Sequence, residues 1–127
     1  MIKKVLLVED KPNNMRLIRQ LMDDIGDDLD ETIELICADS GKAALEIARD
    51  TPLHLVLMDI SLPDMNGITV TGKLKEYPHL KSIPFIVVTA YAMAQDEQRF
   101  RETFDDYVSK PIDDELFISK IKQWIRG

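Results

Sequence analysis

The chain has 127 residues, of which 45% are hydrophobic, so it is long enough for one compact domain with a core and too short for two. Its formal net charge of −7 disfavours contact with nucleic acid or an anionic membrane surface. The first apolar run, residues 5–8, is too short for a signal peptide or a membrane span, so we expect a cytoplasmic protein. The single cysteine, Cys37, excludes an internal disulfide, and its apolar neighbours favour a buried structural thiol.

Short apolar runs alternate along the chain with segments of helical periodicity. The runs predict five strands, at residues 5–8, 33–38, 55–58, 85–88 and 107–109. The periodic segments predict helices at about residues 13–26, 41–50, 67–75 and 95–104, with a last helix that begins near residue 113 or 114. Gly26 is the predicted stop of the first helix, and Ser40 is the predicted cap of the second. Five apolar residues of the last helix are expected to face the core: Leu116, Phe117, Ile121, Trp124 and Ile125.

This alternation predicts an α/β fold in which right-handed crossovers join parallel strands and helices cover both faces of the sheet. Continuous apolar strands such as residues 55–58 suit burial on both sides. We therefore expect a flavodoxin-like, doubly wound (βα)5 three-layer sandwich with the parallel sheet order 2-1-3-4-5, formed by residues 1–127 as a single domain. In that order the first and third strands are neighbours.

The negative charge is concentrated in one segment. Seven acids and no Lys or Arg lie between Asp23 and Glu34, and this excess equals the net charge of the whole chain. Such a segment is typical of a solvated loop, with an acidic docking surface as the alternative. The spacing of the acids, with no glycine at the central turn position, excludes an EF-hand calcium loop.

Residues that can bind phosphate or a metal ion follow four of the predicted strands. Glu9 and Asp10 follow the first strand, Asp59 the third, Thr89 the fourth and Lys110 the fifth. The carboxyl ends of parallel strands lie along one edge of an open sheet, so we expect these side chains to converge. Three carboxylates placed together require a cation, and Mg²⁺ is the natural one because it prefers oxygen ligands. Zinc is not expected, because the two histidines have no partner at ligand spacing and there is one cysteine.

One of these carboxylates can act as a nucleophile and form an aspartyl phosphate. Asp59 is the best candidate, because it stands alone at its strand end, whereas Glu9 and Asp10 form a pair that can hold a metal ion. The hydroxyl of Thr89 and the ammonium of Lys110 suit the oxygens of a transferring phosphoryl group.

At these residues the chain resembles the receiver domain of bacterial two-component response regulators. The matching segments are Val8-Glu9-Asp10, residues 58–67, Val88-Thr89-Ala90 and residues 107–111, in that order and over nearly the full length. The stretch Thr-Ala-Tyr-Ala-Met at residues 89–93 is most similar to small stand-alone receivers of the DivK kind.

The resemblance implies a role for each residue of the predicted site. Asp59 matches the phosphoacceptor. Glu9 and Asp10 match the acidic pair that holds Mg²⁺ together with Asp59 and the backbone carbonyl of Ser61. Lys110 matches the cation that contacts the phosphate.

The resemblance also implies residues that report or tune phosphorylation. Thr89 matches a hydroxyl that moves toward the phosphoryl group, and Tyr107 matches an aromatic switch, for which core packing is the structural alternative. Ser61 and Tyr91 match positions that tune the lifetime of the phosphoryl group. Pro111 matches a proline preceded by a cis peptide bond, which is an accessible geometry for proline.

A phosphohistidine on a sensor histidine kinase or a histidine phosphotransfer protein is the implied donor. Phosphorylation is expected to change the face formed by the helix at 95–104, the strand at 107–109 and the last helix. No output domain follows Gly127, so we expect that face to act on a downstream protein rather than directly on nucleic acid or a membrane. The implied chemistry is that of a phosphoacceptor signalling protein with at most slow self-dephosphorylation, rather than of an enzyme.

The chain departs from the usual receiver pattern in two places. The acidic segment resembles an insertion between the first helix and the second strand, and we expect it at the edge opposite the phosphorylation site. Thr103-Phe104 stands where the family commonly has Gly-Ala, which bears on the end of the helix at 95–104 and its output surface.

Three alternative functions fit the sequence less well. Residues 67–73 match most of a phosphate-binding P-loop, but Leu74 stands where Ser or Thr must reach Mg²⁺, and the segment lies inside a predicted helix. An aspartate-based phosphatase would have a second acid at Ser61. A receiver fold used only as a binding scaffold would be expected to have lost a key residue, and none is missing.

Overall fold

The computed structural model describes residues 2–90 and 101–126, in which strands and helices alternate. The strands are β1 (Ile2–Val8), β2 (Thr32–Ala38), β3 (Leu55–Met58), β4 (Phe85–Thr89) and β5 (Asp106–Ser109). The helices are α1 (Pro12–Leu29), α2 (Gly41–Arg49), α3 (Gly67–Leu74) and α5 (Asp114–Arg126), with a 3-10 turn η1 (Pro78–Leu80). Of the helix expected at 95–104, the structure describes residues 101–104, and 101–103 are helical.

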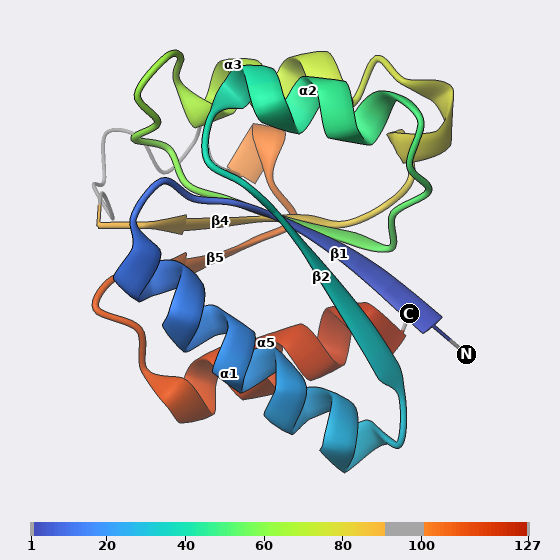
Figure 1. Cartoon of the computed structure of the whole chain (residues 1–127), viewed down its shortest axis with the longest axis vertical. Helices are drawn as coiled ribbons and strands as arrows, with labels where there is room; N and C mark the ends of the chain where they lie inside the picture. The colour runs from blue at the N-terminus through green and yellow to red at the C-terminus, as the bar shows by residue number, and fades with distance from the viewer. Residues whose placement is uncertain (1, 91–100, 127) are drawn as a thin grey trace.

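The five strands form one parallel sheet in the order β2-β1-β3-β4-β5, so the predicted topology is confirmed. Val8 at the end of β1 pairs with Ala38 on one side and Met58 on the other. Thr89 at the end of β4 pairs with Ser109 of β5. The carboxyl ends of the strands are therefore in register along one edge of the sheet. Helices α2 and α3 cover one face of the sheet, and α1 and α5 cover the other (Figure 1).

Alternate residues of the central strands divide the core into two layers. Leu6, Val56 and Val87 face the layer under α2 and α3, and the layer also contains Ala44 and Val70 from those helices. The opposite layer contains residues of the central strands and of α1 and α5: Val5, Leu7, Leu55, Leu57, Ile86, Val88, Ile18, Met22, Phe117 and Ile121. Burial on both faces explains why these strands are continuous apolar runs rather than alternating ones.

Helix α1 passes through Gly26, so the predicted stop at this glycine is wrong. The helix ends instead at Leu29, and Asp30 takes the left-handed conformation at φ 53°. The N–H of Glu31 donates to the carbonyl of Gly26 at 2.9 Å, and a Cβ added to Gly26 would lie 2.9 Å from the Glu31 carbonyl. Gly26 therefore allows the chain to turn closely past the helix on its way into β2.

The acidic segment forms mainly the last two turns of α1, so the expectation that it is a loop is wrong. Its aspartates are nevertheless exposed, as their charges require. No basic residue lies in the last turn of α1, where the helix dipole disfavours acids. Lys122 of α5 contacts Asp28 at 2.9 Å and offsets part of this charge. The segment lies where α1 returns to the start of β2, at the edge opposite the carboxyl ends of the strands (Figure 1).

Helix α5 buries Phe117, Ile121 and Ile125 on one stripe with a spacing of four residues. Trp124 is half-buried beside this stripe. Leu116 is 48% exposed, so its predicted place in the core is wrong. One residue corresponds to about 100° around a helix, which turns Leu116 away from the stripe that begins at Phe117.

Cys37 is half-buried rather than buried, because β2 is an edge strand whose side chains are only partly covered. Its sulfur accepts a hydrogen bond from the guanidinium of Arg19 at 3.3 Å.

Phe104 explains the departure from Gly-Ala at residues 103–104. Phe104 is 6% exposed and belongs to the core layer under α2 and α3, which also contains Phe85 and Leu80. Lys75, at the end of α3, donates to the carbonyl of Thr103, and its ammonium lies 5.2 Å from the centre of the Phe85 ring. Phe104 therefore fills core volume, and the hydrogen bond of Lys75 joins the Thr103 carbonyl to the end of α3.

Among the described residues, no helix combines the length and the apolar character needed to cross a bilayer.

Candidate functional site

Glu9, Asp10 and Asp59 lie together at the carboxyl edge of the sheet. The N–H of Glu9 donates to Ala38 at 2.9 Å, and the N–H of Asp59 donates to Val8 at 3.0 Å, so both residues continue the strand ladders by one position. One oxygen from each of the three carboxylates lies within 4.8 Å of the others. Glu9 is 1% exposed and Asp59 is 5% exposed, so their charges are largely removed from water.

Lys110 follows the edge strand β5, and its side chain reaches this carboxylate cluster. Its Nζ lies 2.7 Å from Glu9 Oε1 and 3.3 Å from Asp59 Oδ2. The Lys110 N–H donates to the Thr89 carbonyl at 2.9 Å, and the Lys110–Pro111 peptide bond is cis. The hydrogen bond to Thr89 anchors Lys110 to the end of β4, and the Lys110 ammonium lies beside the carboxylates.

The two buried carboxylates have opposite pKa shifts. Burial raises the pKa of Asp59 to about 6, and the hydrogen bond and negative charge of Glu9 act in the same direction. Burial also acts to raise the pKa of Glu9, but the hydrogen bonds with Lys110 and Asp59, together with the charge of Lys110, outweigh it and hold that pKa below its ordinary value. When the two carboxyls share one ammonium, Glu9 therefore keeps its charge and Asp59 retains the proton to higher pH.

The cluster contains an unused oxygen that suits a hard cation. Asp10 Oδ1 is buried and makes no hydrogen bond within the described part of the chain. Glu9 Oε2, in contrast, accepts from the N–H groups of Asp10 at 3.0 Å and Lys11 at 3.4 Å. A buried, unsatisfied carboxylate oxygen is costly, and a divalent cation with oxygen ligands would satisfy it. The residues present therefore fit Mg²⁺.

Thr89 and Tyr107 lie on neighbouring strands beside the cluster. Thr89 is 1% exposed at the end of β4, whereas Tyr107 of β5 is 48% exposed. The core-packing alternative for Tyr107 is therefore wrong. Tyr107 pairs with Val87, which is two residues before Thr89, so both side chains belong to the same face of the sheet.

The loop after β3 is held in place by hydrogen bonds at several points. The N–H of Ser61 donates to Asp59 Oδ1 at 3.2 Å, and Ser61 forms a β-bridge with Asn66. The N–H of Gly67 donates to the Ile60 carbonyl at 2.9 Å. Ser61, whose carbonyl is expected to bind metal, thus lies in a loop that is folded tightly against Asp59.

Asp64 fixes the same loop to α2, a role that the sequence reasoning missed. Its two oxygens accept from the N–H groups of Gly41 at 2.8 Å and Lys42 at 2.9 Å, and these hydrogen bonds hold the pKa of Asp64 below its usual value. Ser40 caps the same helix as predicted, with its hydroxyl accepting from the Ala43 N–H at 3.1 Å. Acids are generally favoured at helix N-termini, and this preference is the signal in the sequence that could have indicated the role of Asp64. Asp64 lies 23 residues from Gly41, so no short-range pattern connects it to α2.

The P-loop alternative does not agree with the fold. Residues 67–73 lie inside α3 rather than between a strand and a helix, so their N–H groups do not form a phosphate cradle. Tyr91, expected to tune the phosphoryl lifetime, lies outside the described residues.

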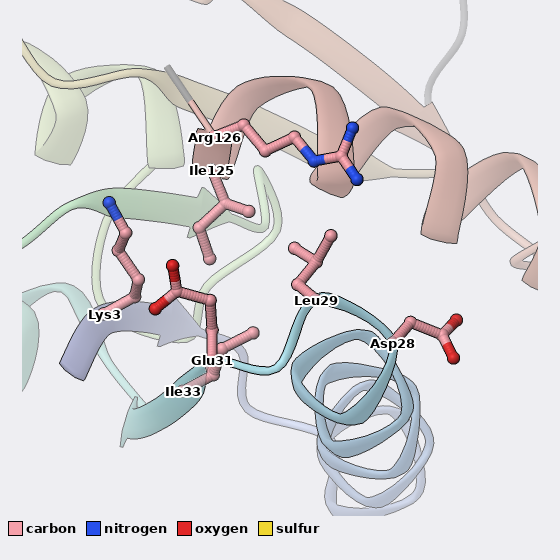
Figure 2. Close-up of a pocket in the computed structure, with 7 residues that line it drawn as sticks. All are labelled: Lys3, Asp28, Leu29, Glu31, Ile33, Ile125 and Arg126. Carbon is pink, nitrogen blue, oxygen red and sulfur yellow. The ribbon is translucent and has the colours of Figure 1, made fainter. Parts of the chain in front are cut away.

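A hollow of about 270 Å³ lies at the other edge of the sheet, away from the carboxylate cluster. Figure 2 shows its lining, which comes from β1, the end of α1, the start of β2 and the end of α5. It contains two cations, Lys3 and Arg126, and two acids, Asp28 and Glu31, around apolar side chains. This mixed lining does not resemble the acidic site, and it shares no residue with it.

Curated relatives match the chain over almost its whole length. The polar-differentiation response regulator DivK of Brucella ovis is 43% identical over 126 residues, which cover 98% of each chain. The protein of the same name from Brucella anthropi is 42% identical, with the same coverage.

Solved structures of receiver domains share the fold. The receiver domain of the sensor histidine kinase PA1611 from Pseudomonas aeruginosa PAO1, solved with a magnesium ion in its active-site cleft, superposes with a TM-score of 0.85 at 24% identity and full coverage of both chains. The receiver domain of a signal transduction histidine kinase from Syntrophus aciditrophicus gives a TM-score of 0.83 at 26% identity, covering 98% of this chain and 91% of that one.

The family model described as the response regulator receiver domain matches residues 5–122. That range begins within β1, includes β2 to β5, and contains all four residues of the carboxylate and lysine cluster. The chain therefore belongs to the response regulator receiver domain family.

Proposed function

We propose that this chain accepts a phosphoryl group on Asp59 and signals through the resulting change of its surface. The observation that carries the proposal is the buried cluster in which Asp59 lies beside Glu9, Asp10 and the ammonium of Lys110. Asp59 is the carboxylate with an oxygen toward Lys110 and with no second acid beside it in the chain. A sensor histidine kinase or a histidine phosphotransfer protein is the proposed donor, and a downstream protein is the proposed target.

In the transfer step, an oxygen of the Asp59 carboxylate attacks the phosphorus of a phosphohistidine in line with the bond that breaks. An acyl phosphate O–P bond forms, the P–N bond breaks, and the histidine of the donor leaves and takes up a proton. Lys110 stabilises the charge of the transferring oxygens. Slow hydrolysis reverses the modification, with water attacking phosphorus to give phosphate and the free carboxylate. The protein is therefore proposed as a phosphoacceptor rather than an enzyme in the ordinary sense.

Mg²⁺ is the proposed cofactor, held by Glu9, Asp10, Asp59 and the Ser61 backbone carbonyl. When bound, it would supply positive charge that neutralises the carboxylates and the incoming phosphoryl oxygens. The magnesium ion in the PA1611 receiver domain supports this proposal, as does the unsatisfied buried oxygen of Asp10.

After transfer, the added charge of about −1.5 to −2 draws the Thr89 hydroxyl toward the phosphoryl group. Space opens on that face of the sheet, and the exposed ring of Tyr107 turns inward to fill it. The surface around residues 101–104, β5 and α5 then changes shape for its protein partner. Ser61 and Tyr91 are proposed to set how easily water reaches the phosphoryl group. A cytoplasmic location is part of the same proposal.

Mass spectrometry after treatment with acetyl phosphate and Mg²⁺ tests the proposal. The wild type is expected to gain one phosphoryl group, Asp59→Ala none, and the exposed control Asp50→Ala the same amount as the wild type. Equal labelling of Asp59→Ala would show that the phosphoacceptor is another residue.

A further inference from the structure

Lys120 of α5 is bound to the strand that carries Tyr107. Its ammonium donates to the Tyr107 carbonyl at 2.6 Å and to Asp106 Oδ1 at 3.2 Å. The same ammonium lies 4.6 Å from the centre of the Tyr107 ring. An ammonium has three N–H donors, so two are used by these oxygens while the cation faces the ring.

Asp106 holds this arrangement from the other side. Its Oδ2 accepts from the indole N–H of Trp124 at 2.9 Å, and its Oδ1 also accepts from the Tyr107 N–H at 2.8 Å. Burial acts to raise the pKa of Asp106, but the hydrogen bonds from Trp124, Tyr107 and Lys120 hold it below the usual value. Asp106 is therefore an anion at neutral pH, and it fixes the position of the ammonium under the ring.

The ring contact exists only while Tyr107 is exposed. Val108 faces the core layer that α1 and α5 cover, so Tyr107 belongs to the opposite face of β5, with Thr89 on the neighbouring strand. A Tyr107 ring turned over β4 toward Thr89 would leave the ammonium, which α5 holds on the other side of β5. A cation on an aromatic face is worth about 0.5–1 kcal/mol at exposed sites, which corresponds to a factor of about two to five.

We propose that Lys120 is a positioning residue that holds the Tyr107 ring in its exposed state and so opposes activation. This inference rests on the proposed function, in which the inward ring belongs to the phosphorylated state. Since the cation–π contact stabilises only the exposed state, it shifts the equilibrium away from the state that phosphorylation selects. Removing the contact should make the site easier to activate.

The experiment uses the full chain with Mg²⁺ and beryllofluoride, an anion that stands in for the phosphoryl group. Trp124 is the single tryptophan, and its contact with Asp106 makes its fluorescence a reporter of this edge. Lys120→Gln keeps an N–H donor but removes the charge, whereas Lys120→Arg keeps both. Lys122→Gln is the matched control, because Lys122 lies on the same helix and pairs with Asp28 instead.

Lys120→Gln should bind beryllofluoride about two- to five-fold more tightly than the wild type, while Lys120→Arg and Lys122→Gln stay close to it. Loss of a positive charge by itself would weaken binding of an anion, so the direction of the change separates the two causes. In a Tyr107→Ala background the gain in beryllofluoride affinity caused by Lys120→Gln should vanish. Equal or weaker binding by Lys120→Gln in the otherwise wild-type protein, or a gain in affinity that persists without the ring, would overturn the proposal.

A second measurement separates failure of this inference from failure of the proposed function. In protein labelled with 3-fluorotyrosine, Tyr107→Phe assigns the Tyr107 fluorine signal. Without beryllofluoride, Lys120→Gln should move that signal toward its position in activated wild type, and Lys122→Gln should not. An unmoved signal overturns the role of Lys120 even if the wild type responds to beryllofluoride. If the wild type shows no response to beryllofluoride, the phosphoacceptor function is overturned. The Tyr107 fluorine signal without beryllofluoride would still show whether Lys120 contacts the ring.

Discussion

Gly67 lies directly against the backbone of Asp59: a Cβ added at Gly67 would be 2.2 Å from the Asp59 carbonyl oxygen. The neighbouring atoms are backbone, so they have little freedom to move aside. The first residue of α3 is thereby packed against the proposed phosphoacceptor, and its lack of a side chain is a steric requirement of the site.

Gly67→Ala should therefore lower the free energy of unfolding by about 1–3 kcal/mol or more and weaken Mg²⁺ binding, because the Asp59 backbone must shift. Gly72→Ala is the control within the same helix. A Cβ there meets no atom within 4 Å, so that change should raise stability by about 0.5–1 kcal/mol through helix propensity. Urea unfolding of both variants measures the difference, and equal effects would contradict the packing argument.

Asp59→Asn should stabilise the metal-free protein at neutral pH. The native state keeps the Asp59 proton up to about pH 6, whereas the unfolded chain releases it near 3.8, so the free energy of unfolding falls as the pH rises between these values. Asparagine avoids this cost, and we expect a gain of about 1–3 kcal/mol at pH 7.5 that disappears near pH 4. Urea unfolding at the two pH values without Mg²⁺ measures it, and a gain independent of pH would argue against a charge effect.

Asp10→Asn should separate metal binding from folding. Because Asp10 Oδ1 has no hydrogen-bond partner in the described chain, the metal-free variant should be as stable as the wild type or more so. Mg²⁺ should raise the Tm of the wild type but much less that of Asp10→Asn. The Mg²⁺ effect on the wild type should also weaken below about pH 6, where Asp59 becomes protonated. Thermal unfolding with and without Mg²⁺ tests both, and an equal Mg²⁺ effect in the variant would remove Asp10 from the ligand set.

Lys110→Met should raise the pKa of both Glu9 and Asp59, because it removes the cation that they share. We expect a loss of about 2–3 kcal/mol in metal-free stability, partly restored by Mg²⁺. Lys122→Met removes a surface pair whose side chains are 29% and 58% exposed, so it should cost about 0–1 kcal/mol. Chemical denaturation with and without Mg²⁺ decides the point, and similar costs for the two lysines would show that the buried pair contributes little.

Phe104→Ala should lower the free energy of unfolding by about 3 kcal/mol or more, because the loss of a residue that is 6% exposed would leave a cavity in the core layer under α2 and α3. Leu116→Ala removes a side chain that is 48% exposed, so its effect should stay within about 0.5 kcal/mol. Thermal or urea unfolding compares them. A small cost for Phe104→Ala would mean that the turn after residue 103 collapses readily around the smaller residue.

The fold and the site residues were predictable because their signals are local. Continuous apolar runs mark the central strands β1, β3 and β4, and Glu9, Asp59 and Thr89 each follow or end such a run, while Lys110 directly follows the short strand β5. Once the strand order is given, the parallel register brings the carboxyl ends to one edge without further information.

The remaining features depend on contacts between distant segments. Gly26 has the local signal of a helix stop, but the chain that returns from Glu31 requires a residue without a side chain within the helix. Asp64 reaches across 23 residues to α2, and Lys120 reaches Asp106 across 14. Such pairs have no short-range pattern in the sequence, so only the packed structure shows them.

The hollow lined by both Lys3 and Arg126 has a practical consequence, because it brings the two ends of the described chain to the same edge of the sheet. A short glycine-rich linker could join them into a circular permutant, and fusion partners or surface tethers attached there would point away from the carboxylate cluster.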